Sequence, residues 1–164
     1  DWVLGEKPDA RVVLMGQDEG ALAVLLAQAK GLPQAVTAVA AESPTLDIPQ
    51  IARETLEDAG ESVGALEEVL LSAAYRLAFG EKLERISEER FAGGGVPTLL
   101  FAGTLDEQSP AYVAQDIAAA MGSRAEVCLI EGATHGMARY VDPEQYYDAL
   151  LTFFREQLAE NEPS

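Results

Sequence analysis

The fold is decided by the stretch VVLMGQDEGA, residues 12–21. A strand is predicted over Arg11–Met15, because a continuous apolar run next to turn residues is typical of a strand buried on both faces of a parallel sheet. Two glycines then bracket Asp18, and Ala21–Lys30 has the pattern of a helix. A strand, a G-x-x-x-G turn and a helix in this order predict a sharp bend that lifts the Asp18 side chain clear of the sheet, above the helix amino terminus.

The glycines of this turn, Gly16 and Gly20, have a steric explanation. The backbone bends so closely around Asp18 that a side chain two positions away on either side is expected to clash. A carboxylate at this point is favoured by the free N–H groups and the dipole of the helix. Two interpretations of Asp18 stay open here: it stands at the nucleophile position of the motif, where serine is usual, or it only caps the helix.

Apolar runs and helical patterns alternate along the rest of the chain. Further buried strands are predicted at Val36–Ala40, Val96–Ala102 and Ala125–Ile130. Helices are predicted at 48–59, 63–79, 82–90, 110–121 and 143–160. This order indicates the α/β class: three layers, α/β/α, around a mostly parallel sheet with right-handed crossovers. Residues 1–41 and 96–164 form the predicted core, and 42–95 form a helical insertion.

Two further polar residues follow buried strands. Asp106 comes just after the strand that ends at Ala102, and His135, the single histidine, lies in a glycine-bracketed loop after the last strand. Because the carboxyl ends of parallel strands share one edge of a sheet, Asp18, Asp106 and His135 are predicted to meet there. A nucleophile, an imidazole and an orienting carboxylate together carry out nucleophilic and general-base catalysis. Taken singly, Asp106 has a simpler interpretation as a turn residue, and a lone histidine is most often structural.

These motifs resemble those of the α/β-hydrolase fold, across essentially the whole chain. Val12–Ala21 is similar to the family's nucleophile elbow, Pro97–Asp106 to its acid-bearing strand, and Gly132–Gly136 to its histidine loop. The resemblance is closest to serine esterases and peptidase-like members with a G-x-S-E-G elbow. It implies a fold of this type that lacks its first strands, with the helical insertion 42–95 acting as a cap over the site that sets substrate choice.

The resemblance also implies roles for individual residues. Asp106 would orient His135, and His135 would act as the general base. The backbone N–H of Glu19 would be one donor of the oxyanion hole. Gln17 and Met137, which adjoin the elbow and the histidine loop, are expected to contact the substrate. No metal and no cofactor is expected at such a site.

The sequence departs from the family's pattern at two points. Asp18 stands where esterases have serine; haloalkane dehalogenases and epoxide hydrolases use an aspartate there, but they usually carry an aromatic residue next, where this chain has Glu19. A serine enzyme in which aspartate has replaced the serine, by drift or by engineering, fits the flanking residues at least as well, and such a protein could not form an acyl-serine. The second departure is that only four strands are predicted. The edge of the first strand is therefore expected to be covered by an upstream half of the fold or by a second chain. The opening residues, Asp1–Gly5, resemble the end of a helix and indicate a chain cut from a longer one.

Composition narrows the class of partner. Lys and Arg number 11 against 28 Asp and Glu, and the net charge of −17 repels nucleic-acid backbones and anionic membrane surfaces. One cysteine and one histidine exclude an internal disulfide and a multi-histidine metal site. No apolar run approaches the roughly 20 residues of a membrane helix. No leader segment is visible, so the cytoplasm is the default expectation for location.

Three functions remain open on the sequence. The leading hypothesis is a hydrolase of a small neutral ester, amide or related substrate that uses Asp18, Asp106 and His135. The second is a haloalkane dehalogenase or epoxide hydrolase, in which the Asp18 carboxylate attacks carbon directly. The third is a non-catalytic module of the same fold that binds a ligand or a partner chain.

Overall fold

The computed structural model describes residues 2–60, 64–79, 82–93 and 95–159. The chain divides into two compact units, one made of Asp1–Thr45 with Glu88–Ser164 and the other of Leu46–Ser87. The larger unit holds a four-stranded sheet and the helices packed on it, and it carries all the predicted site residues.

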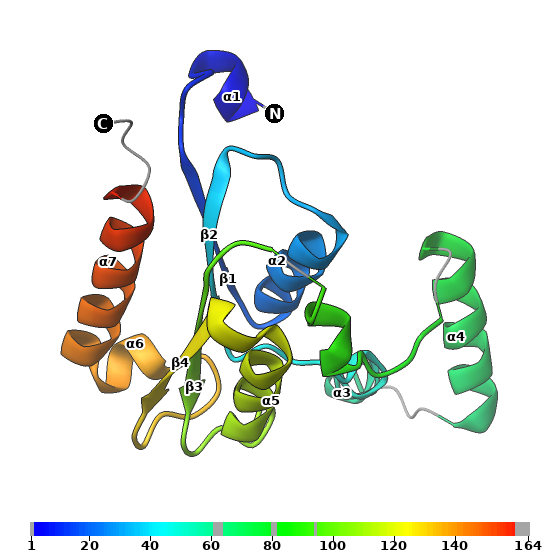
Figure 1. Cartoon of the computed structure of the whole chain (residues 1–164). Helices are drawn as coiled ribbons and strands as arrows, with labels where there is room; N and C mark the ends of the chain where they lie inside the picture. The colour runs from blue at the N-terminus through cyan, green and yellow to red at the C-terminus, as the bar shows by residue number, and fades with distance from the viewer. Residues whose placement is uncertain (1, 61–63, 80–81, 94, 160–164) are drawn as a thin grey trace. The chain divides into compact units, whose positions relative to one another are not determined.

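The sheet contains β1 (Val12–Gln17), β2 (Val36–Glu42), β3 (Thr98–Gly103) and β4 (Ala125–Ile130), in the order β1-β2-β3-β4 (Figure 1). All three pairings are parallel. At the carboxyl edge Gln17 lies opposite Glu42, and Gly103 lies opposite Ile130. The predicted parallel sheet is therefore confirmed, and the loops after the strands open at one edge.

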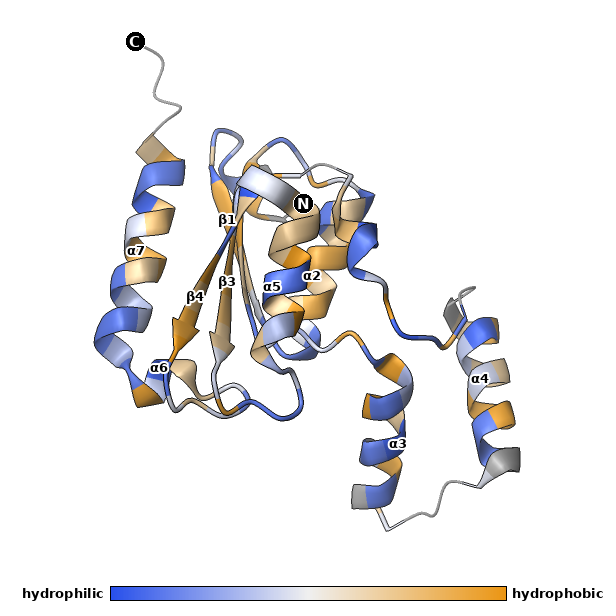
Figure 2. Ribbon diagram, turned by 60° about the horizontal axis from the view of Figure 1, so that its bottom comes forward, coloured by the Kyte–Doolittle hydropathy of each residue, from blue (hydrophilic) through white to orange (hydrophobic). Residues whose placement is uncertain are grey.

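Helices cover both faces of the sheet (Figures 1 and 2). On one face lie α2 (Glu19–Lys30) and α5 (Ala111–Met121), and on the other lie α6 (Ala138–Val141) and α7 (Pro143–Ala159). The strands are mainly apolar, as Figure 2 shows, and the two central ones, β2 and β3, are buried almost throughout because helices cover both of their faces. On the α7 face the core includes Phe101, Ile130, Tyr146, Leu150 and Phe153. The predicted three-layer α/β/α class is confirmed.

The smaller unit consists mainly of α3 (Ile48–Asp58) and α4 (Ala65–Phe79). The Asp47 carboxylate caps α3 by accepting a hydrogen bond from the Gln50 N–H at 3.0 Å. Arg53 of α3 pairs with Glu68 of α4 at 2.6 Å. The role of this unit as a cap stays a prediction.

Three details differ from the sequence-based prediction. The predicted helix at 82–90 is wrong: among the residues described there, only the 3-10 turn Glu88–Phe91 is helical, because the Ile86 N–H is engaged by the Leu46 carbonyl at 2.9 Å. The insertion was predicted over 42–95, but Glu42 ends β2 and Phe91 is buried in the larger unit, so both belong to the core. The first helix, α1 (Trp2–Glu6), continues through Gly5 instead of ending there.

Short helices complete the larger unit. η2 (Gly122–Arg124) follows α5 and leads into β4, and α6 follows the histidine loop.

None of the described helices has both the length and the apolar composition that a membrane span needs.

Candidate active site

The turn between β1 and α2 holds Asp18 in a conformation that few residues adopt. Its φ is 60° and its ψ is −125°, and aspartate tolerates positive φ better than most residues. A Cβ placed on Gly16 would lie 2.1 Å from the Gly20 carbonyl oxygen, so only glycine fits at that position. A Cβ on Gly20 would have no atom within 4 Å, so the steric explanation holds for Gly16 and is wrong for Gly20.

The Asp18 carboxylate does not cap α2. Its side chain makes no capping hydrogen bond, and one of its oxygens, Oδ1, contacts Nε2 of His135 instead. The backbone carries the turn, because the Asp18 N–H donates to the Glu42 carbonyl at 3.0 Å and the Asp18 carbonyl accepts from the Leu22 N–H at 3.1 Å. The capping interpretation is therefore wrong. The carboxylate, with 40% of its side chain exposed, is open to a reaction partner.

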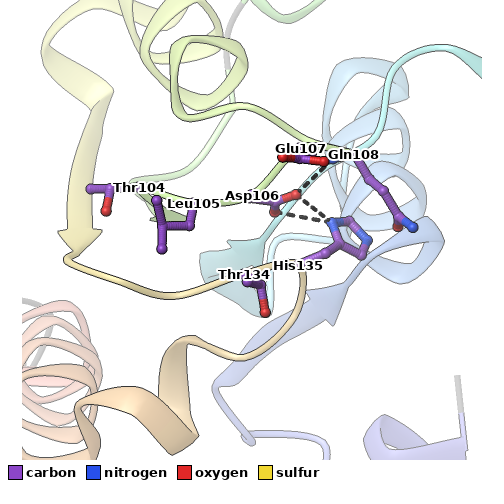
Figure 3. Close-up of a pocket in the computed structure, with 7 residues that line it drawn as sticks. All are labelled: Thr104, Leu105, Asp106, Glu107, Gln108, Thr134 and His135. Carbon is purple, nitrogen blue, oxygen red and sulfur yellow. Dashed lines mark hydrogen bonds and ion pairs between the residues drawn. The ribbon is translucent and has the colours of Figure 1, made fainter.

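Asp106 meets the other nitrogen of the same ring. His135 Nδ1 lies 3.0 Å from both carboxylate oxygens of Asp106, as Figure 3 shows. The Asp106 side chain is fully buried, and its Oδ1 also accepts hydrogen bonds from the N–H groups of Gln108 at 3.1 Å and Ser109 at 2.8 Å. Asp106 is thus a turn residue and a histidine partner at once. The turn fixes the carboxylate, and the carboxylate fixes the ring.

The two carboxylates favour the charged form of His135. Partial burial alone would lower the pKa of His135, but the hydrogen bond with Asp18 and the charge of Asp106 outweigh it, so the pKa is raised above its ordinary value. The imidazole therefore stays protonated to higher pH than a free histidine. It is suited to give a proton in a first step rather than to take one.

The other predicted residues lie close by in sequence but have different surroundings. Gln17 Nε2 donates to the Gly136 carbonyl at 2.9 Å, and its Oε1 accepts from Arg139 at 3.1 Å, so its amide already has protein partners. Glu19 is exposed and begins α2, where the amides of the first turn have no acceptor within the helix. Met137 is 40% exposed just before α6.

A cavity of about 660 Å³ opens beside the ring of His135 (Figure 3). It is lined by Thr104, Leu105, Asp106, Glu107, Gln108, Thr134 and His135. Asp18, Gln17 and Met137 are not among its lining residues. Among the described part of the chain no group of histidine, cysteine and carboxylate side chains could hold a metal ion.

Sequence reasoning missed two residues that support the histidine loop and the start of α6. Glu42 is fully buried at the end of β2 and accepts hydrogen bonds from the Ala138 N–H at 3.1 Å and the Tyr146 hydroxyl at 2.9 Å. Ser43, with φ of 50°, accepts from the Gly136 N–H at 3.3 Å. The signal in the sequence is a charged residue directly after the largely apolar run Val36–Ala41, but its charge alone predicts the beginning of the polar insertion.

Solved structures share this arrangement of strands and helices. An esterase of Pyrococcus furiosus superposes with a TM-score of 0.68 at 15% identity, over 96% of this chain and 58% of that chain. The chain has the α/β-hydrolase fold. An α/β-hydrolase enzyme from the metagenome of sediments of the Mar Chica lagoon, Morocco, matches with a TM-score of 0.62 at 22% identity, over 95% of this chain and 66% of that one. A monoacylglycerol lipase of Paleococcus ferrophilus matches with a TM-score of 0.60 at 17% identity, over 94% and 72%.

These similarities extend over part of the longer α/β-hydrolase chains only. This chain spans 58% of the Pyrococcus esterase and 66% of the Mar Chica enzyme. No protein-family model matches the sequence, and no curated protein sequence matches it. The α/β-hydrolase fold is thus established by structure, and the activity has to be argued from the site.

Proposed function

We propose that this chain carries the reactive centre of a hydrolase that cleaves a small neutral ester, amide or related substrate. The observation that carries the proposal is the position of His135, whose two ring nitrogens contact the carboxylates of Asp18 and Asp106. Structurally similar chains that are described as an esterase and a lipase support the same class of reaction.

In this proposal Asp18 is the nucleophile. Its carboxylate attacks the carbonyl carbon of the substrate. The His135 imidazolium gives its Nε2 proton to the oxygen of the departing alcohol or to the nitrogen of the departing amine. The product of this step is a mixed anhydride between Asp18 and the acyl group. The backbone N–H of Glu19, at the start of α2, donates to the developing oxyanion.

Water completes the cycle. His135, now neutral and oriented by Asp106, accepts a proton from water, and the hydroxide attacks Cγ of Asp18 in the anhydride, which breaks the bond between Cγ and the bridging oxygen. The acid product leaves, one proton goes to solvent, and the Asp18 carboxylate and the His135 imidazolium are restored. The net reaction is the hydrolysis of one ester or amide bond by one water molecule.

A carboxylate nucleophile fits the electrostatics of this site. A serine at the elbow would need a neutral imidazole to take its proton, whereas a carboxylate nucleophile needs no general base to attack. Formation of the anhydride removes the negative charge at Nε2. The pKa of His135 then falls, and the ring becomes a base at the step that needs one.

Isotope labelling tests the proposal. Repeated turnover of 4-nitrophenyl acetate in H₂¹⁸O, followed by mass spectrometry of the peptide with Asp18, is expected to show the label in Asp18, because hydroxide attacks its Cγ in each cycle. Asp18→Asn is expected to abolish turnover. If the upstream half of the fold is supplied, Asp18→Ser is expected to restore or raise the hydrolysis of small activated esters, because without the Asp18 carboxylate His135 is more easily neutral and can take the proton of serine. Full activity of Asp18→Asn, or no label in Asp18 after repeated turnover, would refute the proposal.

The carboxylate at the elbow also favours a second candidate, attack on a saturated carbon. A haloalkane or an epoxide would then form an alkyl ester with Asp18, and water activated by His135 would hydrolyse it. In His135→Gln that ester is expected to accumulate and to be visible as a mass increase on Asp18. A panel of haloalkanes and epoxides that gives no adduct excludes this candidate. Absence of turnover on every substrate class leaves the binding module as the function.

We also propose that β1 pairs with a further strand, from an upstream half of the fold or from a second chain. β1 is an edge strand of the described sheet, and Met15 on it is 42% exposed. Three apolar side chains of α7 are exposed at spacings of four and seven residues: Tyr147, Leu151 and Leu158. At these spacings they form one apolar stripe along the helix, which is unusual for a surface that contacts only water. Self-association that is lost in Tyr147→Ser/Leu151→Ser, measured by sedimentation, would support the second chain. Unchanged sedimentation of both proteins would exclude it.

A further inference from the structure

Glu42 is a charged residue in a place where charges are rare. Its side chain has no exposed surface, and burying an ionised carboxylate costs several kcal/mol unless hydrogen bonds compensate. Two donors meet it: the Ala138 N–H on Oε1 at 3.1 Å and the Tyr146 hydroxyl on Oε2 at 2.9 Å. Each carboxylate oxygen therefore has a partner, and the two partners come from different helices, α6 and α7.

The first partner is part of the histidine loop. Ala138 begins α6, three residues after His135. The same segment is held at Gly136, whose N–H donates to Ser43 Oγ at 3.3 Å and whose carbonyl accepts from Gln17 Nε2 at 2.9 Å. The ends of β1 and β2 thus hold the chain that follows His135 at two positions.

The second partner fixes Glu42 itself. Tyr146 is 1% exposed and stacks on Phe101 of β3 with the ring centroids 4.2 Å apart. Burial, followed by the charge of Glu42, raises the pKa of Tyr146, so its hydroxyl remains a donor over the whole physiological range. The charged and titratable groups that face Glu42 are Tyr146 of α7 and Arg139 of α6, and those that face His135 are Asp18 and Asp106.

We propose that Glu42 is a positioning residue: held by Tyr146, it anchors the amino end of α6 and so keeps His135 between Asp18 and Asp106. A carboxylate suits this task because hydrogen bonds to an ionised acceptor are about twice as strong as neutral ones. Glu42 does not touch the reacting atoms in this proposal. Its effect on hydrolysis rests on the proposed function, but its effect on the position of His135 does not.

The single histidine makes that position measurable, because every imidazole signal in an NMR spectrum of the full chain belongs to His135. Loosening the loop moves the ring away from the carboxylates that stabilise its cation. Tyr146→Phe and Glu42→Ala are therefore expected to shift the His135 titration to lower pH. Glu42→Gln, which keeps a hydrogen-bonding atom at both positions, is expected to retain most of the wild-type titration.

Thr98→Val is the matched control. Thr98 is fully buried at the amino end of β3, whereas the site lies at the carboxyl ends of the strands, and it accepts a hydrogen bond from Gln28 at 2.9 Å. Its loss is expected to destabilise the fold without moving the His135 titration. Tyr146→Phe is also expected to lower kcat for ester hydrolysis about 10- to 100-fold with KM unchanged, because a small displacement of a catalytic group has this effect.

The outcomes separate the two proposals. If the wild-type chain hydrolyses no ester but Tyr146→Phe shifts the His135 titration, the proposed function fails and the positioning role stands. If Tyr146→Phe leaves the titration as unchanged as Thr98→Val does, the positioning role is refuted. It is also refuted if Glu42→Gln shifts the titration as far as Glu42→Ala while Tyr146→Phe does not, since charge alone would then explain the effect.

Discussion

The elbow predicts that two glycines four residues apart respond to alanine in opposite ways. In Gly16→Ala the new Cβ would lie 2.1 Å from the Gly20 carbonyl oxygen and 2.7 Å from the Ala21 nitrogen. Both are backbone atoms, so no side-chain rotation relieves the clash and the turn itself has to move. Overpacking usually lowers the free energy of unfolding by about 1–3 kcal/mol. Because this contact is very short and the atoms are rigid, we expect Gly16→Ala to be less stable than wild type by about 3 kcal/mol. Because Asp18 lies in the displaced turn, activity is expected to fall as well.

Gly20→Ala is the control within the same turn. Its Cβ would have no neighbour within 4 Å, and Gly20 is the second residue of α2. Alanine in a helix is more favourable than glycine by about 0.5–1 kcal/mol, so this variant is expected to be slightly more stable than wild type. Urea unfolding followed by circular dichroism measures both changes. Equal stabilities of the two variants, or a Gly16→Ala protein as stable as wild type, would refute the steric argument for the elbow.

Three further predictions concern the site. Asp106→Asn is expected to lower kcat for ester hydrolysis about 10²–10⁴-fold, the usual contribution of positioned acid–base catalysis, because a neutral amide no longer stabilises the cation of His135; steady-state kinetics measures it. In spite of burial, Asp18 and Asp106 raise the folded-state pKa of His135, so the stability that His135 contributes is fully present below its unfolded pKa of about 6.5 and is lost as pH rises through the folded pKa. The difference in unfolding free energy between wild type and His135→Gln should therefore shrink with rising pH, and a constant difference would contradict this. Gln17→Leu removes one hydrogen bond to Gly136 of the histidine loop and one from Arg139 of α6. It is expected to lower kcat more than it raises KM, whereas a residue that contacts substrate would mainly raise KM.

The strands and the meeting of the three site residues could be predicted because both depend on local patterns. Apolar runs such as Val96–Ala102 have one stable arrangement in this class of fold, covered on both faces, and turn residues mark their ends. The carboxyl ends of parallel strands then bring Asp18, Asp106 and His135 to one edge without any knowledge of distances. The predicted strand boundaries differ from the observed ones by at most two residues, and those of β4 agree at both ends.

What could not be predicted depends on contacts between distant residues. Glu42 has a charge that favours the surface, and only its hydrogen bonds with Ala138 and Tyr146, about a hundred positions away, allow it to be buried. The four-residue helix α6 is too short to show a periodic pattern. At 82–87 the charged residues match a helix as well as a loop, and the bond between Ile86 and Leu46 decides the outcome.

The strand order β1-β2-β3-β4 has a consequence for how the protein acquires activity during folding. Each strand pairs with the one made just before it, so the sheet can grow in the direction of synthesis, with one long closure between β2 and β3. In this order of strand addition Asp18 is placed first, and His135 is placed last, after β4 has docked. Chains still in synthesis therefore contain the proposed nucleophile without its proposed acid–base partner, and under this proposal hydrolysis begins only when the final strand has docked.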